Sequence, residues 1–407
     1  MLKNYLVTTF RNIRRQKGYA FINVVGLAVG LACSFFILHW VTNELSYDRF
    51  HEDGDRLFRV MRHGYLEENT YTWESVPKPL ADVLEADYPE VENAMLVTGS
   101  YQGLIARDGE VFKREGGYVA SSFFEAFTFP LLRGDASTVL DDPQSIVISE
   151  DLASSLFGAD WQTDASVIGQ VLNVENRADF RITGVFEDLP DNSSLQFDFV
   201  LPMAEFLPRN EWAENWGSAG LRLFVRLKPG ADYQVLNEKI RDVIRENKGF
   251  ADATPFLQPF TDMRLHSDFE GGNLVGGRIT YVRIFSVMAV FLLLIACINF
   301  MNLATARSAK RAKEVGVRKT IGATQPLLIR QFMVESLVTA FAAFIVAAGL
   351  VVALLPVYNE LSDTAMQLGD LDPSFIGMML GISIVTGRSP SMPSNFIRTV
   401  NRTDPIS

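Results

Sequence analysis

The sequence predicts an integral membrane α-helical protein of four spans, with a large external α/β (α+β) domain between the first two. Four segments are too apolar for water, near residues 19–41, 284–306, 332–356 and 374–387. The long polar stretch 42–283 separates the first two of them. Lys and Arg gather beside alternate ends of these segments, as expected where short loops face the cytoplasm.

The first span, 19–41, contains no Lys, Arg, Asp or Glu. At 1.5 Å per residue its helix is long enough to cross a hydrocarbon core of about 30 Å. Gly26 and Gly30 lie four residues apart in it, which favours close packing against another helix. Before this span, residues 1–18 place apolar side chains at helical spacing among basic ones, which predicts a cytoplasmic amphipathic helix in the lipid headgroup layer.

Basic residues set the orientation of the spans. Residues 1–18 carry five of them and no acid, and the loop 307–331 carries seven against the single acid Glu314. Residues 357–373 carry four acids and neither Lys nor Arg. We therefore place the amino terminus and the loop 307–331 inside, and 42–283 and 357–373 outside.

The external region is acidic, with 41 Asp and Glu against 22 Lys and Arg, whereas the whole chain carries a formal charge of −11. We interpret this acidity as a feature that keeps an external domain soluble. Because 42–283 exceeds the usual size of one domain, we expect two subdomains. Gly271-Gly272 and Gly276-Gly277 predict a flexible entry into the second span.

Local patterns predict the elements of this region. A helix over 79–92 places Leu80, Val83 and Leu84 on one face and ends around Pro89. The strand 145–149 leads into a helix that Ser149 can cap and Gly158 can end. The further predicted elements are strands at 94–98, 171–175, 180–185 and 221–227 and a helix over 231–247 with Val235, Leu236, Ile240, Val243 and Ile244 on one stripe.

The cytoplasmic loop 307–331 is the most chemically organised segment. Arg307, Arg311, Glu314 and Arg318 fall on one face of a predicted helix, where Glu314 can bridge Arg311 and Arg318. Ala309, Ala312 and Gly316 form a strip of small residues on another side, and Gly322 is placed to end the helix. This pattern predicts a charged surface against which another protein can pack closely.

Several kinds of chemistry have no motif in the sequence. It contains no Gly-x-x-x-x-Gly-Lys-Ser/Thr and no Gly-x-Ser-x-Gly, which are the motifs of phosphate-binding loops and of many serine hydrolases. The four histidines have no metal-ligand spacing, and both cysteines fall inside predicted spans. We expect no catalytic, cofactor or metal site, and no contact with nucleic acid.

Several stretches resemble the FtsX/MacB-type family of ABC transporter permeases, and together they cover most of the chain. The most diagnostic is INFMNLATARSAKRAKEVGVRKTIGAT, after the second span. The others are FRNIRRQKGYAFINVVGLAVGLA, NELSYDRFHEDGDRLFRV, IVISEDLASSLFG, VIGQVLNV, ITGVFEDLPDNSSLQFDFVLP and LQPFTDMRLHS. Their order agrees with the topology derived from charge.

The resemblance implies a MacB-like periplasmic core domain on a bacterial cytoplasmic (inner) membrane protein, with a mostly β subdomain inserted near 116–210. It also implies a separate cytoplasmic ATPase, a homo- or heterodimer of permeases, and a periplasmic adaptor or hydrolase as a further partner. The ATPase contact would then be formed by Arg307, Arg311, Glu314, Gly316, Arg318, Lys319 and Gly322.

The resulting hypothesis is a permease subunit that moves its periplasmic domain with energy from the ATPase, and so drives export or extraction of a substrate. One alternative is a signalling subunit that activates a periplasmic hydrolase or a sensor without transport. A membrane-anchored enzyme is a third, with no catalytic motif behind it. The tail 388–407 departs from the family pattern, so we expect the fourth span, 374–387, to be incomplete.

Overall fold

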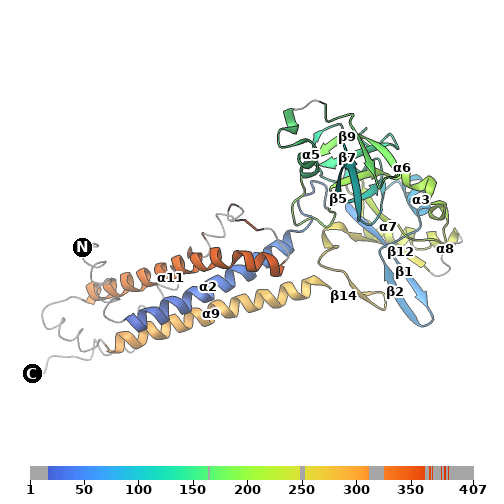
Figure 1. Ribbon diagram of the computed structural model, residues 1–407. Helices are drawn as coiled ribbons and strands as arrows, with labels where there is room; N and C mark the ends of the chain where they lie inside the picture. The colour runs from blue at the N-terminus through green and yellow to red at the C-terminus, as the bar shows by residue number, and fades with distance from the viewer. Residues whose placement is uncertain are drawn as a thin grey trace, which may run out of the picture. The chain divides into compact units, whose positions relative to one another are not determined.

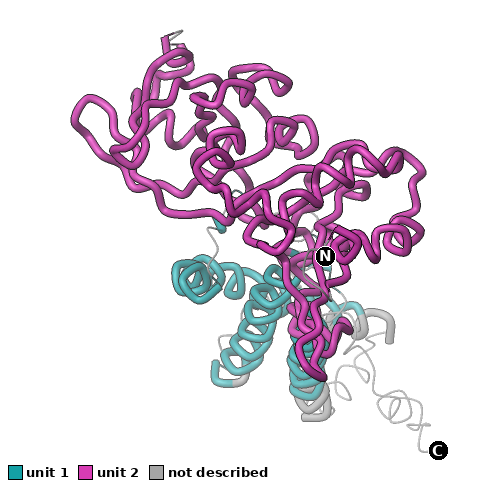
Figure 2. Tube along the Cα trace, turned by 90° about the vertical axis from the view of Figure 1, so that its right-hand side faces the viewer, with its two compact units in different colours: residues 1–42, 282–407 teal, residues 43–281 magenta. Residues whose placement is uncertain are grey.

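The protein comprises two compact units, residues 43–281 and residues 1–42 with 282–407 (Figure 2). The computed structural model describes residues 17–163, 166–247, 253–310 and 325–362, with a few single positions between 366 and 384. The predicted amphipathic segment, most of the cytoplasmic loop, the fourth span and the tail lie wholly or almost wholly outside these residues. The elements below are therefore those of the described parts.

Three helices dominate the first unit: α2 (Lys17–Ser46), α9 (Arg278–Lys310) and α11 (Gln325–Ser362). Among the described residues, the segments Ala20–Ser46, Arg278–Leu303 and Met333–Ser362 are long and apolar enough to cross a membrane. They coincide with the first three predicted spans. Large apolar side chains of α9, such as Phe291 and Ile295, are more than half exposed, as expected for a lipid-facing surface.

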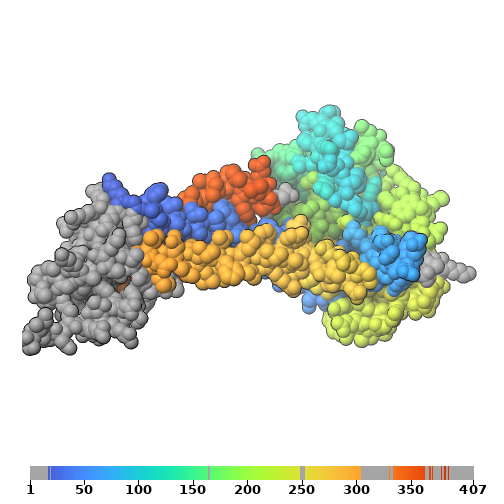
Figure 3. Space-filling model, turned by 90° about the horizontal axis from the view of Figure 1, so that it is seen from below, coloured from blue at the N-terminus to red at the C-terminus, as the bar shows by residue number. Residues whose placement is uncertain are grey.

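Helix α2 lies alongside both other helices (Figures 1 and 3). Its Trp40 ring meets Phe285 of α9 at 5.0 Å, and its Phe36 ring stacks on Tyr358 of α11 at 4.8 Å between ring centroids. A hydrogen bond of 3.0 Å joins His39 Nδ1 and the Tyr358 hydroxyl. The buried core of this unit includes Leu27, Leu31, Ala296, Phe300, Ala343 and Ala347. Small alanines let the helices approach closely.

Residues 43–281 build a mixed sheet of twelve strands and a hairpin of two. The strands of the large sheet are β1 (Leu57–Leu66), β2 (Asn69–Trp73), β3 (Val91–Val97), β4 (Tyr101–Arg107), β5 (Glu110–Val119), β6 (Leu131–Arg133), β7 (Ser145–Ser149), β8 (Val171–Val174), β9 (Ala178–Phe186), β10 (Phe199–Pro202), β11 (Arg222–Leu227) and β12 (Ala253–Pro259). The hairpin consists of β13 (Asp268–Glu270) and β14 (Asn273–Gly276), with Gly271 and Gly272 in its turn. Both glycines have positive φ, as this tight turn requires.

The strand pairings run β10-β7-β9-β8-β4-β5-β3-β11-β1-β12, and β10 also pairs with β5. Strands β10, β7, β9, β8, β4 and β5 therefore close a ring, which we call the β-ring. Its β5–β10 and β7–β9 pairs are parallel. The predicted inserted subdomain, 116–210, falls largely on this ring, although the ring already begins with β4 and remains continuous with the rest of the sheet.

Short helices cover the strands. They are α3 (Pro79–Asp87), α4 (Phe123–Ala126), α5 (Glu150–Phe157), α6 (Met203–Phe206), α7 (Tyr233–Ile240) and α8 (Val243–Glu246), with the 3-10 turns η1 (Trp161–Thr163), η2 (Leu207–Arg209), η3 (Glu211–Glu214) and η4 (Phe260–Asp262). Helix α5 begins as predicted, because the Ser149 hydroxyl oxygen accepts a hydrogen bond of 3.1 Å from the Leu152 N–H.

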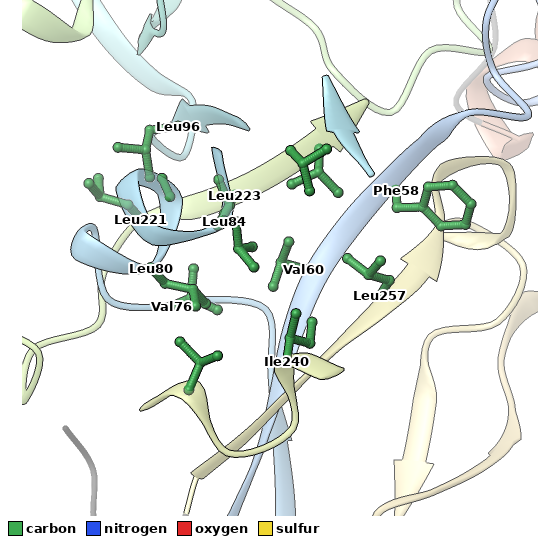
Figure 4. Packing of buried hydrophobic residues seen from close by; sticks show 14 of the residues in the cluster. Phe58, Val60, Val76, Leu80, Leu84, Leu96, Leu221, Leu223, Ile240 and Leu257 are labelled. Carbon is green, nitrogen blue, oxygen red and sulfur yellow. The ribbon is translucent and has the colours of Figure 1, made fainter. Parts of the chain in front are cut away.

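The helix predicted over 231–247 is two helices, α7 and α8, separated at Arg241 and Asp242. The expectation that Val235 shares the buried stripe was wrong: it is 51% exposed, because it precedes Leu236 by one residue and so lies about 100° around α7 from it. Leu236, Ile240, Val243 and Ile244 are buried as predicted. They pack on one face of the sheet, beside Leu80 and Leu84 of α3 and against Val60, Leu223 and Leu257 of the strands (Figure 4).

A second core holds many aromatic side chains. It gathers Phe123, Phe127, Phe129, Phe224 and Phe260, all buried. His51 lies among them, 5% exposed, with the Phe127 and Phe260 ring centroids at 5.5 and 5.3 Å. The imidazole Nδ1 accepts a hydrogen bond of 3.1 Å from the Thr128 N–H. Burial lowers the pKa of His51 to about 4, so the ring is neutral at physiological pH.

Candidate coupling junction

The predicted ATPase contact lies mostly outside the described residues. Arg307 falls in the last part of α9, and its side chain is not described. Arg311, Glu314, Gly316, Arg318, Lys319 and Gly322 all lie in the gap between α9 and α11. The contact therefore stays a prediction.

The two glycines singled out in the first span face α9. A Cβ built on Gly30 would lie 2.4 Å from Cβ of Ala296, which is far inside van der Waals contact. A Cβ on Gly26 would lie 3.2 Å from Nδ2 of Asn299. Gly30 thus marks a point where two backbones approach so closely that no side chain fits between them.

The structure brings together a polar cluster that the sequence had not indicated. It lies within the unit 43–281, where the last turn of α2, the loop after it and the first residue of α9 meet. We call this cluster the junction, and its residues are Glu44, Ser46, Tyr47, Asp48, Asn192, Ser194, Arg264 and Arg278. Three separate stretches of chain supply them.

Glu44 is the centre of one half of the junction. Its side chain is only 3% exposed and is paired with an arginine on two sides. Arg278 Nη1 donates to Glu44 Oε1 at 2.6 Å, and Arg264 donates to both carboxylate oxygens at 3.3 Å. The Arg264 guanidinium also lies over the Tyr47 ring, 4.0 Å from its centroid, a cation–π contact. The end of α2 is thereby tied to the start of α9.

Asp48 is the centre of the other half. It is fully buried and has a positive φ of 60°. Its carboxylate accepts hydrogen bonds from the Ser194 N–H at 2.7 Å and the Ser194 hydroxyl at 2.5 Å. Its own N–H donates to the Asn192 carbonyl at 2.9 Å. Burial raises the pKa of Asp48, and the hydrogen bonds from Ser194 oppose that rise.

Ser46 completes the attachment of this loop. Asn192 Nδ2 donates to the Ser46 carbonyl at 3.2 Å and lies 2.9 Å from its hydroxyl oxygen. The stretch 192–194, which lies between β9 and β10 of the β-ring, thus forms five hydrogen bonds with Ser46 and Asp48, at and just after the end of α2. The junction therefore attaches both the β-ring and the root of α9 to the end of the first span.

The junction is a network of paired charges and hydrogen bonds. Two carboxylates and two guanidinium groups balance in charge, and the buried polar atoms are occupied by one another. Among the described residues, no group of three His, Cys, Asp or Glu side chains is placed to hold a metal ion. Paired, well-packed charges of this kind favour one defined geometry.

Sequence reasoning missed the junction because its partners are distant in the chain. Asp48 and Ser194 are separated by 146 residues, and Glu44 and Arg278 by 234. One signal was present: an acid follows the first apolar segment and a base precedes the second, so their ends carry opposite charge. The stretches NELSYD and PDNSS, both part of the resemblance, also hold the residues that meet here.

Two protein-family models match this chain. A family model described as the MacB-like periplasmic core domain matches residues 20–243, more than half of the chain. A second, the FtsX-like permease C-terminal model, matches residues 286–401. The two matches follow each other in the order expected from the topology.

Curated relatives are similar over most of this chain. The macrolide export ATP-binding/permease protein MacB of Neisseria meningitidis is 23% identical over 299 residues, which are 71% of this chain and 42% of that protein. The pyoverdine export ATP-binding/permease protein PvdT of Pseudomonas savastanoi is 28% identical over 290 residues, 66% and 40% respectively. The chain thus spans less than half the length of the relatives it matches.

Among solved structures, a domain of a permease protein from Porphyromonas gingivalis is 26% identical, with a TM-score of 0.43, and covers 52% of this chain and 93% of that one. The periplasmic region of MacB from Actinobacillus actinomycetemcomitans is 14% identical, with a TM-score of 0.38, and covers 52% and 91%. With both family models matched in sequence along one chain that carries long apolar helices, this protein belongs to the FtsX/MacB-type ABC transporter permeases with a MacB-like periplasmic core domain.

Proposed function

We propose that the chain is the permease subunit of an ABC exporter in the bacterial cytoplasmic (inner) membrane. In this proposal, a separate ATPase hydrolyses ATP, the membrane helices move, and the periplasmic domain follows, which drives export or extraction of a substrate from the periplasmic side. Relatives named for macrolide and pyoverdine export support the general class of export. The substrate of this chain is left open, since one fold serves many substrates.

The junction is the observation that carries the coupling step. A helix that moves can drive a domain only if the connection between them is stiff. Glu44 lies in the last turn of α2 and binds Arg278, the first residue of α9. Asp48 fixes the loop of the β-ring to the same turn. Movement of the two spans would therefore reach both halves of the periplasmic domain.

The ATPase would bind the cytoplasmic loop 307–331. This part of the proposal is based on the sequence alone. One face of the predicted helix carries Arg307, Arg311, Glu314 and Arg318, and Gly316 lies in a strip of small residues. Lys319 and Gly322 complete the predicted contact. Two copies of the permease, alike or different, would assemble with the ATPase, as in the family.

The experiment uses the full chain reconstituted with the ABC ATPase encoded beside its gene. Cys33 and Cys297 are replaced by serine, and a single reporter cysteine is placed on the exposed surface of the β-ring. We expect the permease to stimulate ATP hydrolysis, and ATP to change the labelling rate of the reporter. Arg311→Glu with Arg318→Glu should abolish binding of the ATPase and both effects.

The Glu44→Ala variant separates ATPase binding and ATP hydrolysis from movement of the periplasmic domain. It should leave ATPase binding and ATP hydrolysis in place while abolishing the nucleotide-dependent change in labelling; the exposed Asp55→Ala serves as the matched control. A response that survives in Glu44→Ala would remove the junction from the proposal. A loop variant that still binds and stimulates the ATPase would overturn the contact at 307–331. If nucleotide-dependent movement activates a periplasmic hydrolase and no compound is exported, the proposed function would be signalling instead of transport.

A further inference from the structure

A cavity lies on the β-ring, away from the junction residues. It has a volume of about 480 Å³ and opens between the β8–β9 turn on one side and α6 with η2 on the other. This size falls in the range of small-molecule sites, about 300–1,000 Å³. Its wall combines aromatic rings with charged side chains from the β8–β9 turn, α6 and η2.

Aromatic rings form one wall. Tyr101 of β4 and Tyr118 of β5 stack with centroids 6.2 Å apart and planes within 16°, and Phe206 of α6 lies 5.2 Å from Tyr118. Phe199 of β10 supports Tyr101 edge-on at 6.1 Å. It can do so because β5 has glycine at 116, where a Cβ would lie 2.3 Å from the Phe199 ring. The rings are thus held in place from behind.

A buried carboxylate faces these rings. Glu205 of α6 is only 9% exposed and pairs with Arg209 of η2 at 2.6 Å, while the Arg209 side chain is 58% exposed. Burial raises the pKa of Glu205, and Arg209 opposes that rise. A nearly buried acid that pairs with a solvent-exposed arginine is a group that a ligand cation can engage.

The opposite wall repeats this combination of charges. Glu175 and Arg177 lie in and beside the β8–β9 turn and line the same cavity. The Glu175 carboxylate is held in place, since it accepts a hydrogen bond of 2.8 Å from the Leu104 N–H. The cavity thus carries two acids and two bases. A purely cationic ligand would meet both arginines, and a purely anionic ligand would meet both glutamates.

We infer that this cavity binds a small zwitterion with an aromatic side chain, such as a short peptide with free ends. Its ammonium group lies beside Glu205, its carboxylate lies beside Arg209 and Arg177, and its ring stacks on Tyr101 and Tyr118. Each ligand charge then meets an opposite charge, and the internal Glu205–Arg209 pair is exchanged for two pairs with the ligand. This inference is independent of the coupling to an ATPase.

Calorimetric titration of the full chain in nanodiscs tests the inference, with the dipeptide Phe-Ala as the probe. We expect saturable binding with a Kd of about 1 mM or tighter. N-acetyl-Phe-Ala and Phe-Ala amide, which each lack one charge, should bind at least tenfold more weakly. Because these blocked peptides are compared on the wild-type chain, the result does not depend on whether a variant folds.

Variants locate the binding. Glu205→Gln and Tyr118→Leu should each weaken Phe-Ala binding at least tenfold, at an unchanged melting temperature. Glu238→Gln is the matched control, because Glu238 also pairs with an arginine a few residues later in the chain, Arg241, at 3.8 Å. No saturable heat up to about 10 mM, equal affinity for free and blocked peptides, or unchanged binding in Glu205→Gln would each overturn the inference.

Discussion

The Asp48 carboxylate accepts both hydrogen bonds that Ser194 donates, one from its backbone and one from its hydroxyl, across 146 residues of chain. Asp48 itself is fully buried and sits in the left-handed region of backbone space. A strained backbone and a buried charge at one residue are both unfavourable alone. They persist here because the loop of the β-ring satisfies the carboxylate completely.

Asp48→Ala should therefore destabilise the periplasmic unit by about 1–3 kcal/mol, since it leaves the Ser194 donors buried and unpaired. Asp48→Asn should cost less, because asparagine tolerates positive φ and keeps one acceptor for the Ser194 N–H. Thermal unfolding of the full chain followed by tryptophan fluorescence measures this, as four of the five tryptophans lie within 43–281. The exposed Asp55→Ala should leave the melting temperature unchanged; equal effects of the alanine and asparagine variants would contradict the account.

The two arginines around Glu44 should act non-additively. Arg264→Gln or Arg278→Gln alone leaves the carboxylate one guanidinium, but the double variant leaves it buried without a cation. The loss of stability in the double variant should exceed the sum of the single losses, toward the roughly 3–5 kcal/mol of a broken buried pair. Adding Glu44→Gln to the double variant should restore part of the melting temperature, and strictly additive losses would refute the pairing scheme.

Acid should destabilise the periplasmic unit through His51. In the unfolded chain this histidine takes up a proton near its ordinary pKa of 6.5, whereas in the fold it does so only near 4. Protons therefore favour the unfolded state as the pH falls from 6.5 to 4, with a loss of about 3 kcal/mol at the lower end. Above pH 6.5 this contribution is constant.

The variant His51→Asn should flatten that part of the profile, because its side-chain oxygen can still accept from the Thr128 N–H while nothing titrates. His266→Asn, at a half-buried histidine of the same unit, should keep the acid slope. Melting temperatures measured between pH 4 and pH 7 compare the acid slopes of the two variants and the wild-type chain. An unchanged slope in His51→Asn would show that other groups carry the acid sensitivity.

Gly30 should be the least replaceable glycine of the membrane unit. Any side chain there meets the Ala296 Cβ at 2.4 Å, so Gly30→Val has to push α2 and α9 apart. Gly26→Ala meets only the end of the Asn299 side chain at 3.2 Å and should have a smaller effect. Gly349→Ala in α11, with nothing within 4 Å, is the control. Yield and melting temperature of the purified chain compare the three, and a Gly30→Val variant that behaves like the control would exclude tight packing at this point.

Much of the architecture was predictable because its causes are local. Uninterrupted apolar runs predicted the three described helices that are long and apolar enough to cross a membrane. The strand at 145–149 and the Ser149 cap follow from residues within ten positions of each other. The prediction of one helix over 231–247 was only partly right. No Gly or Pro marks the break at Arg241 and Asp242, which comes from how α7 and α8 each fit the sheet.

The junction and the cavity could not be predicted in the same way. Glu44 and Asp48 looked like ordinary solvated acids beside a span, because nothing nearby in sequence reveals their burial. Their partners come from β-strand pairing and loop closure over more than a hundred residues. Glu205 is similar: its short helix follows β10, and only the closure of the β-ring brings it beside Tyr118.

The distance along the chain between Glu44 and Arg278 also has a consequence for biosynthesis. A ribosome must add 220 residues after Glu44 before its partner Arg264 exists, and 234 before its partner Arg278 exists. Most of these residues have to be translocated while the first helix already sits in the bilayer. The Glu44 carboxylate therefore has neither guanidinium partner until most of residues 43–281 has been synthesised. A translocation intermediate arrested before Arg264 would keep this acid unpaired and, we expect, leave the chain open to quality-control proteases.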